Sequence, residues 1–342
     1  MIETLSVSVS PGAARLVQSS GPCDNCGCHD STFLFNNQDY ISGETFAVIQ
    51  CAQCQLARTA IAPDTDLEAY YGPAYYGDEA RRFQPFIERA IARFRDQRAD
   101  SVSRLRLTPG RILDIGCGRG LMLSELKRRG WESVGTEQSP NLAHAISQKT
   151  GLPVHSGPTL SACRFESGEF DVVTLWHVLE HMPDPVQTLR EIHRIVKPGG
   201  FIVVEVPNLQ SWQARLGAGV WFHLDTPRHL YHFSASQLQH TLAEQGFRTT
   251  DIHTFSLEYG PFGMCQTLLN RLTHTPNVLY RWLKRTKLQS AHKPPLHWRD
   301  TALTIACIVP VTLVAVGLEV SSAIFNSGGI VRIVAQKTHP YA

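Results

Sequence analysis

The second half of the chain alternates short apolar runs with segments of helical period, and this alternation predicts its fold class. A stretch with helical spacing follows each run, as residues 121–129 follow residues 112–115. This order of elements is typical of an α/β domain with a parallel, doubly wound sheet. The predicted strands are residues 112–115, 133–136, 152–155, 170–176, 201–206, 247–255 and 330–335.

The N-terminal part of the chain is organised around paired cysteines. Residues 1–20 predict a flexible tail, and residues 21–60 predict a small domain in which two C-x-x-C pairs flank strands at 32–35 and 45–50. Such pairs supply four thiolates to one tetrahedral zinc ion, so we expect a structural zinc ribbon rather than redox-active or free thiols. The expected ligands are Cys23, Cys26, Cys51 and Cys54, with Cys28 and His29 as spare candidates.

A connector over residues 61–105 leads to the main domain, which we place at 106–342. The connector contains two tyrosine pairs, and it fits either a packed linker or a lid over the substrate. The lid interpretation makes Tyr75 and Tyr76 substrate contacts. Residues 83–105 have apolar positions at i, i+3 and i+4 spacing, which predicts a helix that packs on the sheet of the main domain.

Bulk composition narrows the classes of function. The chain has 342 residues, 18% of them charged, and a formal net charge of +2, so nothing indicates a nucleic-acid partner. The first twenty residues lack a basic region followed by a continuous apolar core, which argues against a secretory signal. Nine cysteines fit a reducing compartment with a metal site better than a disulfide framework. We therefore expect a cytoplasmic protein.

The most informative stretch is 111–120, where a predicted strand breaks into three glycines at alternate positions. A helix follows at once, so the turn offers a nucleotide-type ligand a close approach to backbone N–H groups. The dinucleotide fingerprint G-x-G-x-x-G would need glycine at position 121, which is Leu121. The order here is D-x-G-x-G-x-G from Asp114, which disfavours a Rossmann dehydrogenase.

This stretch resembles motif I of the class I S-adenosylmethionine-dependent methyltransferases, (V/L)LD(I/V)GCGxG. The resemblance spans 111–260 and the last ten residues, and it implies a Rossmann-like seven-stranded sheet whose final strand, 330–335, is antiparallel. It implies S-adenosylmethionine as the cofactor. Glu137 ends the second strand and could accept both hydrogen bonds of a ribose diol, a role that the family also gives to this acid. The expected cofactor contacts are Asp114, Gly116, Cys117, Gly118, Gly120, Glu137, Trp176 and His177.

The fourth predicted strand leads into His177-Val-Leu-Glu180-His181. H-x-x-E-H is also an inverted zinc-protease motif, but that motif needs a long helix, and two prolines follow His181 within four residues. The segment instead resembles VLEHxxDP of the methyltransferases, at the carboxyl edge of the sheet. We predict His181 as the general base or orienter of the nucleophile, supported by Glu180 or His229. The ubiquinone-pathway O-methyltransferases hold a divalent ion at this segment, where His177 matches the first ligand position.

Aromatic and basic side chains gather again between the fifth strand and a helix that begins after Ser234. Arg228 could pair with a phosphate or carboxylate, and histidines titrate near neutral pH. We therefore predict Arg228, Tyr231 and His232 as substrate contacts, with a packed loop as the alternative. The stretch P-R-H-L-x-x-F-S resembles a segment of methyltransferases of sugar and glycan pathways, several of which carry an N-terminal zinc ribbon.

Residues 260–326 predict a helical insertion before the last strand, with a long apolar run at 301–318 behind a basic stretch. The run is long enough to span a bilayer, but the strand after it returns to the same sheet. We expect residues 301–325 either to contact a membrane in its plane or to be buried in the domain or in a homodimer interface.

These patterns together predict an enzyme that transfers a methyl group from S-adenosylmethionine to a small-molecule or glycan acceptor, with a sugar or lipid-linked glycan as first choice. A lipid quinone-like acceptor is the alternative. A non-catalytic scaffold would not need the intact Asp114, glycines and Glu137.

Overall fold

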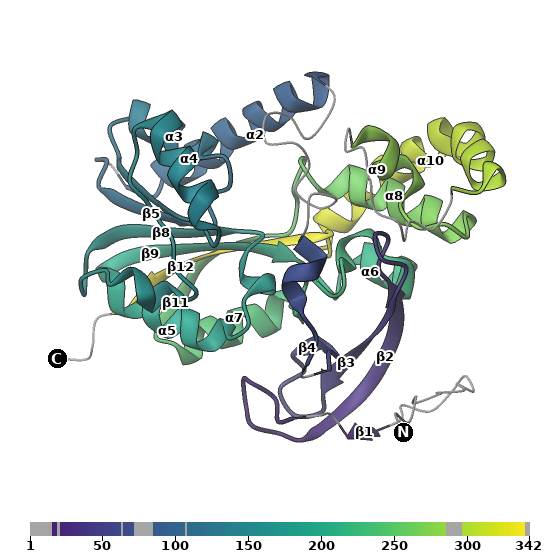
Figure 1. Cartoon of the computed structure of the whole chain (residues 1–342), viewed down its shortest axis with the longest axis horizontal. Coiled ribbons are helices and arrows are strands. Elements are labelled where there is room, and N and C mark those ends of the chain that lie inside the picture. Colours follow the sequence, from purple (N-terminus) through teal and green to yellow (C-terminus); the bar gives the residue numbers. More distant parts are fainter. Residues whose placement is uncertain are drawn as a thin grey trace.

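The computed structural model of the chain describes residues 16–18, 21–62, 64–71, 85–106, 108–284 and 296–338. This part of the chain contains two sheets, helices that cover the larger sheet, and a further group of helices at one end of the molecule (Figure 1). Of the predicted tail, the structure describes only a short strand, β1 (Leu16–Gln18). The predicted lid residues Tyr75 and Tyr76 lie outside the described residues.

A seven-stranded sheet forms the centre of the larger domain, in the order β11-β12-β9-β8-β5-β6-β7. The strands β5 to β9 run parallel, whereas β12 lies between β9 and β11 and pairs antiparallel with both. The predicted Rossmann-like sheet with an antiparallel last strand is therefore confirmed. The strands are β5 (Arg111–Ile115), β6 (Glu132–Thr136), β7 (Val154–His155), β8 (Phe170–Trp176), β9 (Val196–Pro207), β11 (Phe247–His253) and β12 (Ile330–Lys337).

Helices cover both faces of this sheet because alternate strand residues point to opposite sides. Ile112 and Val172 are buried with side chains of α2 and α3, whereas Leu113 and Val173 are buried with side chains of α5 and α7. Figure 1 shows α2, α3 and α4 on one side of the sheet and α5 and α7 on the other. These helices are α2 (Pro85–Ser103), α3 (Leu121–Arg128), α4 (Pro140–Thr150), α5 (Pro185–Ile195) and α7 (Ala235–Glu244).

Three of these helices begin with a side-chain cap. The side chains of Ser139, Asp184 and Ser234 each accept a hydrogen bond from the backbone N–H three residues on, and so satisfy one free donor of the first turn. Pro140 and Pro185 follow two of these caps at the first helical position, where a missing N–H costs nothing.

The N-terminal domain is built on a smaller sheet in the order β1-β2-β3-β4-β10. Its last strand, β10 (Tyr231–His232), comes from the larger domain and pairs antiparallel with β4. The sequence predicts a separate ribbon over 21–60, but the structure shows that the two domains share this sheet. The other strands are β2 (Asp30–Gln38), β3 (Thr45–Cys51) and β4 (Ala57–Thr59), and a short 3-10 helix, η1 (Leu67–Tyr71), follows.

The remaining helices project from the end of the large sheet as a lobe (Figure 1). We use the name helical lobe for α8 (Gly260–Leu272), α9 (Val278–Leu283) and α10 (Trp298–Ile324). Met264, Cys265 and Leu269 of α8 form a buried apolar cluster with Ala315 of α10. By length and composition α10 could cross a membrane, although only 11% of its most apolar window is buried. Below the lobe, α6 (Trp212–Gly217) leads away from β9.

Candidate active site

The glycine turn lies between β5 and α3, at the carboxyl edge of the sheet. Gly116, Gly118 and Gly120 have φ angles of +65°, +54° and +68°, which side-chain-bearing residues rarely adopt. A Cβ at Gly116 would lie 2.7 Å from a methyl group of Val178, and one at Gly120 would lie 2.8 Å from Ile146. The turn is therefore tight, and the segment after β8 passes directly over it.

Asp114 sits at the end of β5 as a buried carboxylate. Its Oδ1 accepts a hydrogen bond of 2.7 Å from the Thr174 hydroxyl. Burial raises the pKa of Asp114 to about 7, although the hydrogen bond from Thr174 and the charges of Arg98 and Arg95 act in the opposite direction. A cationic ligand group would favour the ionised form, so Asp114 fits the positively charged amino group of an amino-acid-like ligand.

Glu137 follows β6 and faces the glycine turn. Its carboxylate accepts hydrogen bonds from the N–H of Gly118 at 3.1 Å and from the N–H of Gln138 at 3.0 Å. Burial raises its pKa, although both backbone hydrogen bonds oppose the shift. The carboxylate therefore lies against the glycine turn, and its contact with a ribose stays a prediction. Cys117, between two of the glycines, has a raised pKa because its thiol is buried near Asp114 and Glu137.

A pocket of about 110 Å³ opens at this turn. Its wall includes Asp114, the glycine turn, Trp176 and the side chains of Arg95 and Arg98 from α2. The guanidinium of Arg98 lies 4.7 Å from the centre of the Trp176 ring. The predicted contacts Asp114, Gly116, Cys117, Gly118 and Trp176 are thus brought together at one pocket. The sequence reasoning missed both arginines, although Arg98 follows Ile91 and Phe94 at helical spacing and is buried.

His177, a predicted cofactor contact, lies between two carboxylates just after β8. Its Nδ1 lies 3.4 Å from Glu180 and its Nε2 lies 3.3 Å from Glu205. Burial alone would lower the pKa of His177, but Tyr259 and the two carboxylates raise it to about 10. The charged imidazole therefore acts as a counter-ion that holds Glu180 and Glu205. Glu205 is an acidic residue within the otherwise apolar fifth predicted strand. This exception in the sequence could have indicated that a cation lies beside it.

His181, Glu180 and His229 come together as predicted. Their candidate ligand atoms all lie within 4.8 Å of one another. Nδ1 of His181 lies 2.9 Å from the carbonyl oxygen of Arg228, and the hydroxyl of Tyr71 lies 3.2 Å from the same nitrogen. Such a group can handle a proton, and its donor atoms are also close enough together to hold a cation.

Two of these residues, Glu180 and His229, are buried. Glu180 is 1% exposed, and neither of its carboxylate oxygens has a hydrogen-bond partner within the described part of the chain. Nε2 of His229 lies 4.0 Å from Glu180, and its Nδ1 lies 2.9 Å from the carbonyl of His223. Burial lowers the pKa of His229 well below its usual range, and a proton on His181 would lower it further, so this imidazole is neutral.

Arg228 does not reach a substrate position. Its guanidinium is fully buried and lies 2.6 Å from Asp39 of the N-terminal domain and 2.7 Å from Asp225. Burial alone would lower its pKa, but the two carboxylates raise it well above its usual range. The prediction of a substrate contact is corrected here, because the charge of Arg228 is already used to join the two domains.

The other two predicted substrate residues of this segment, Tyr231 and His232, are also buried. The Tyr231 hydroxyl donates a hydrogen bond of 2.7 Å to Asp24, and Nε2 of His232 lies 3.0 Å from the Thr59 hydroxyl. Both side chains sit on β10, the strand that extends the smaller sheet. Their place in the structure gives them a structural role rather than the predicted substrate contact.

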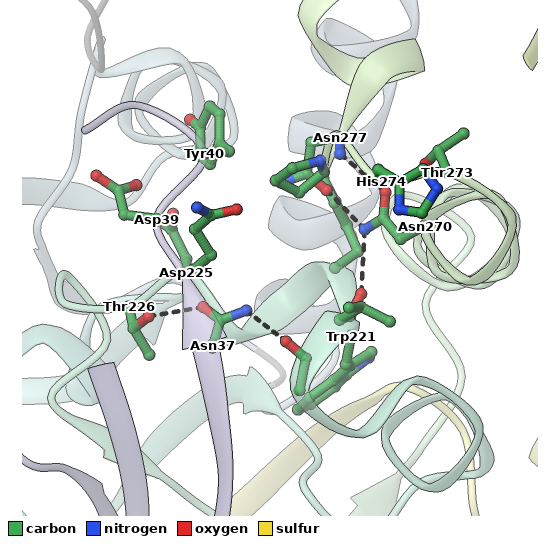
Figure 2. Close-up of a pocket in the computed structure, with 15 residues that line it drawn as sticks. Asn37, Asp39, Tyr40, Trp221, Asp225, Thr226, Asn270, Thr273, His274 and Asn277 are labelled. Carbon is green, nitrogen blue, oxygen red and sulfur yellow. Dashed lines mark hydrogen bonds between the residues drawn. The ribbon is translucent and has the colours of Figure 1, made fainter. Parts of the chain in front are cut away.

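A second pocket, of about 70 Å³, lies where the N-terminal domain meets the helical lobe. Asn37 donates to the Gly219 carbonyl at 2.8 Å and accepts from Thr226 at 2.6 Å, while Asn270 donates to Asn277 at 2.9 Å. Figure 2 shows these amides engaged between the pocket walls. Since these amides already form hydrogen bonds with groups of the pocket walls, we interpret the pocket as part of the contact between the N-terminal domain and the helical lobe.

The four predicted zinc ligands also come together. The Sγ atoms of Cys23, Cys26, Cys51 and Cys54 lie within 4.8 Å of one another, and the pairs 23/54 and 26/51 are each 3.5 Å apart. Four thiolates at the corners of a tetrahedron around zinc, with Zn–S bonds of about 2.3 Å, would be about 3.8 Å apart. Cys28 lies outside the group and contacts the carbonyl of Asp30.

The sheet order with its antiparallel β12, together with the acid, glycine turn and second acid, defines a class I S-adenosylmethionine-dependent methyltransferase. A family model described as methyltransferase domain matches residues 81–252, half of the chain, and the chain belongs to this family. The cofactor, S-adenosylmethionine, fits the buried Asp114, the glycine backbone and Glu137.

Several curated relatives share part of this domain. The chain is 29% identical over 164 residues to a ubiquinone biosynthesis O-methyltransferase of Acinetobacter baylyi, which is 44% of this chain and 68% of that protein. It is 37% identical over 102 residues to the ubiquinone biosynthesis O-methyltransferase of Ruegeria pomeroyi, 29% of this chain and 41% of that one. The match spans about half the length of most of these relatives. A methyltransferase structure from Archaeoglobus fulgidus is 18% identical, with a TM-score of 0.46 over 80% of this chain and all of that one.

Proposed function

We propose that the enzyme methylates a hydroxyl oxygen of a sugar or lipid-linked glycan and that His181 removes the proton of that hydroxyl. The observation that carries this proposal is the contact of 2.9 Å between His181 Nδ1 and the Arg228 carbonyl. S-adenosylmethionine supplies a methyl group that is already activated on a sulfonium, so the protein mainly aligns the acceptor and accepts its proton.

The contact with Arg228 determines which nitrogen of His181 can act as a base. A carbonyl oxygen only accepts hydrogen bonds, so Nδ1 carries a proton, and in the neutral imidazole the lone pair is then on Nε2. The Tyr71 hydroxyl donates to the same carbonyl at 3.1 Å and so reinforces this arrangement. Neutral histidine with a free Nε2 is the form that general-base catalysis needs.

Glu180 supports the charge that His181 would gain. Its carboxylate is buried beside His181 and has no hydrogen-bond partner in the described chain; His177 balances part of its charge at 3.4 Å, and burial strengthens its attraction to a cation on His181. His229 stays neutral because of its burial and does not compete for the proton. In this proposal His181 accepts the proton, Glu180 stabilises the resulting cation, and the neutral His229 lies beside both.

The choice of acceptor rests on sequence resemblance. The resemblance of the ribbon and of the 228–233 segment to glycan-pathway enzymes favours a sugar, but Arg228 itself is occupied between the domains. The similarity to ubiquinone biosynthesis O-methyltransferases favours a second candidate, the hydroxyl of a lipid quinone-like acceptor. Either acceptor carries a hydroxyl to be methylated, and the same base would serve both.

We also propose that the four cysteines hold one structural zinc ion. The sulfur separations fit a tetrahedral site, and four sulfur ligands leave no open position for catalysis. The paired thiols imply a reducing compartment, so we place the enzyme in the cytoplasm and assign it a small-molecule or glycan substrate rather than nucleic acid.

The acceptor can be tested with methyl-labelled S-adenosylmethionine and separate panels of nucleotide sugars, lipid-linked glycans and lipid-tailed hydroquinones. We expect label in a sugar ether, which is stable to alkali. Label in the hydroquinone panel alone would select the second candidate, and label on nitrogen or carbon would contradict oxygen methylation.

A further inference from the structure

The side of α10 that faces solvent is mostly apolar, whereas several polar residues of this helix face the rest of the domain. α10 has 27 residues, and its buried stripe contains the polar residues Asp300, Thr304, Glu319 and Ser322. Between residues 300 and 325 these two acids are the only charged residues, and both face inward. The exposed large apolar side chains are Trp298, Leu303, Ile305, Val309, Leu313, Val314, Val316, Val320, Ile324 and Phe325.

The two inward acids fix this orientation. Asp300 accepts hydrogen bonds from the N–H and the hydroxyl of Thr275 at 2.8 and 2.6 Å. Glu319 accepts from Gln213 at 2.6 Å and from the N–H of Gly329 at 3.2 Å. Turning α10 to hide its apolar side would leave both carboxylates without these partners, which is costly for buried groups. The apolar side therefore faces outward whenever the lobe is folded.

The shape of this surface favours lipid over protein. At 100° per residue the exposed positions cover roughly 200° of the helix circumference, whereas a helix that docks on one partner usually offers an apolar stripe of about 100°. The result is a convex ridge about 40 Å long, from the rise of 1.5 Å per residue. Val309 and Leu313 are 68% and 71% exposed at its middle, and aromatic residues stand at its ends, Trp298 at 74% and Phe325 at 67%.

Charge adds a second argument at one end of the ridge. Asp300 bonds to the backbone N–H of His274 and Thr275, so the end of α8 lies beside the start of α10. Arg271 and Arg299 are exposed there, next to Trp298, while the one acid among them is turned inward. Basic residues beside an interfacial tryptophan are suited to anionic headgroups.

We propose that the helical lobe binds anionic phospholipid bilayers, with α10 lying in the plane of the membrane surface. A spanning arrangement does not suit the fold. Asp300 ties the start of α10 to Thr275, and β12, which begins at Ile330 soon after α10 ends, pairs with β9 and β11. Both ends of the helix are thus held by the same domain, on one side of a bilayer. The proposal does not depend on the identity of the methyl acceptor.

Flotation of the full chain with vesicles at about 0.1 M salt tests the proposal. We expect binding to phosphatidylcholine vesicles that contain phosphatidylglycerol, and at least tenfold weaker binding of Val309→Glu/Leu313→Glu. Arg271→Gln/Arg299→Gln should weaken binding several-fold on the anionic vesicles. The matched control is Leu216→Glu/Ile252→Glu, which places the same charges at exposed apolar positions of α6 and β11 and should bind like the wild type.

A loss of flotation can be attributed to the surface rather than to unfolding, because the substituted side chains are exposed and the affinity for S-adenosylmethionine shows whether each variant is folded. Absent flotation of a cofactor-binding wild type would overturn the proposal, as would equal binding of wild type and Val309→Glu/Leu313→Glu. Equal binding with and without phosphatidylglycerol would overturn its electrostatic part. A wild-type dimer in solution that the glutamates convert to a monomer, without any flotation, would show that a second copy covers α10 instead.

Discussion

Arg228 and Glu180 are both charged, fully buried and close to the same histidines, yet their surroundings differ in one respect. The guanidinium of Arg228 lies between the carboxylates of Asp39 and Asp225. The carboxylate of Glu180 lies 3.4 Å from the charged His177 and 4.0 Å from the neutral His229, but it has no hydrogen-bond partner among the described residues. The Arg228 cluster is complete within the protein, whereas the Glu180 cluster keeps unused hydrogen-bonding capacity.

The comparison separates a structural ion pair from a chemical site. A buried pair with satisfied partners stabilises a defined contact, and here it joins the N-terminal domain to the methyltransferase domain. A buried carboxylate with open lone pairs costs stability, and such costs are typical of sites that act on a ligand. Substitutions in the first cluster should therefore affect stability, and those in the second should affect turnover.

The largest expected effect comes from the zinc site. Cys51→Ser should lose the metal, and since zinc binding in small domains is worth about 10–16 kcal/mol, the smaller sheet should unfold. Asp39 belongs to that domain, so the Arg228 cluster would be lost as well. Metal analysis of purified protein should give about one zinc per chain in the wild type and none in the variant. Cys28→Ser is the control and should keep the ion; a wild type without zinc would contradict the account.

Arg228→Met breaks the complete cluster directly. Removing one partner leaves Asp39 and Asp225 buried without their counter-ion, and we expect the free energy of unfolding to fall by about 3–5 kcal/mol. Denaturant titration measures this change. Arg190→Met, at an exposed position of α5, should stay within about 0.5 kcal/mol of the wild type. A similar small change for Arg228→Met would mean that this pair does not hold the domains.

Glu180→Gln removes the open charge but keeps the size of the side chain. We expect kcat to fall by about 10- to 100-fold while the free energy of unfolding stays near that of the wild type, because Glu205 still neutralises His177 when the charge of Glu180 is removed. Steady-state kinetics beside a denaturant titration would show this opposite pattern to Arg228→Met. Loss of stability with unchanged kcat would place Glu180 with the structural residues.

The smallest effect concerns the pH dependence of cofactor binding. The folded protein holds the Asp114 carboxyl at a pKa of about 7, so this group becomes ionised only as the pH rises through 7. Since the amino group of S-adenosylmethionine is cationic up to about pH 8, affinity should rise up to about tenfold from pH 6 to 7.5. Calorimetry with Asp114→Asn should show weaker binding without this rise. A wild-type affinity that falls with pH would contradict the assignment.

Most of the fold was accessible from the sequence because its signals are local. The apolar runs, the capped helix starts and the glycine turn depend on neighbouring residues, and the structure keeps them near the predicted positions. The four cysteines came together for the same reason, as their spacing within each pair is short. The domain contact was not accessible, since β10 pairs with β4 across about 170 residues of sequence.

The roles of single polar residues were the least accessible part. Arg228 and His181 both lie in segments that resemble methyltransferase motifs. Only the structure shows that Asp39 neutralises Arg228 and that a backbone carbonyl orients His181. The contacts of His177 with Glu205 and Tyr259 likewise appear only in the structure. Residue type indicates what a side chain can do, but its partners come from distant segments.

The central claim is that the open cluster around His181 carries the chemistry. The most direct measurement is the single-turnover rate of methyl transfer from labelled S-adenosylmethionine in His181→Ala, at saturating cofactor and with an acceptor identified as above. The account predicts a rate about 10²- to 10⁴-fold below the wild type, with cofactor affinity within a few-fold. An unchanged rate would contradict it and remove His181 from the catalytic residues.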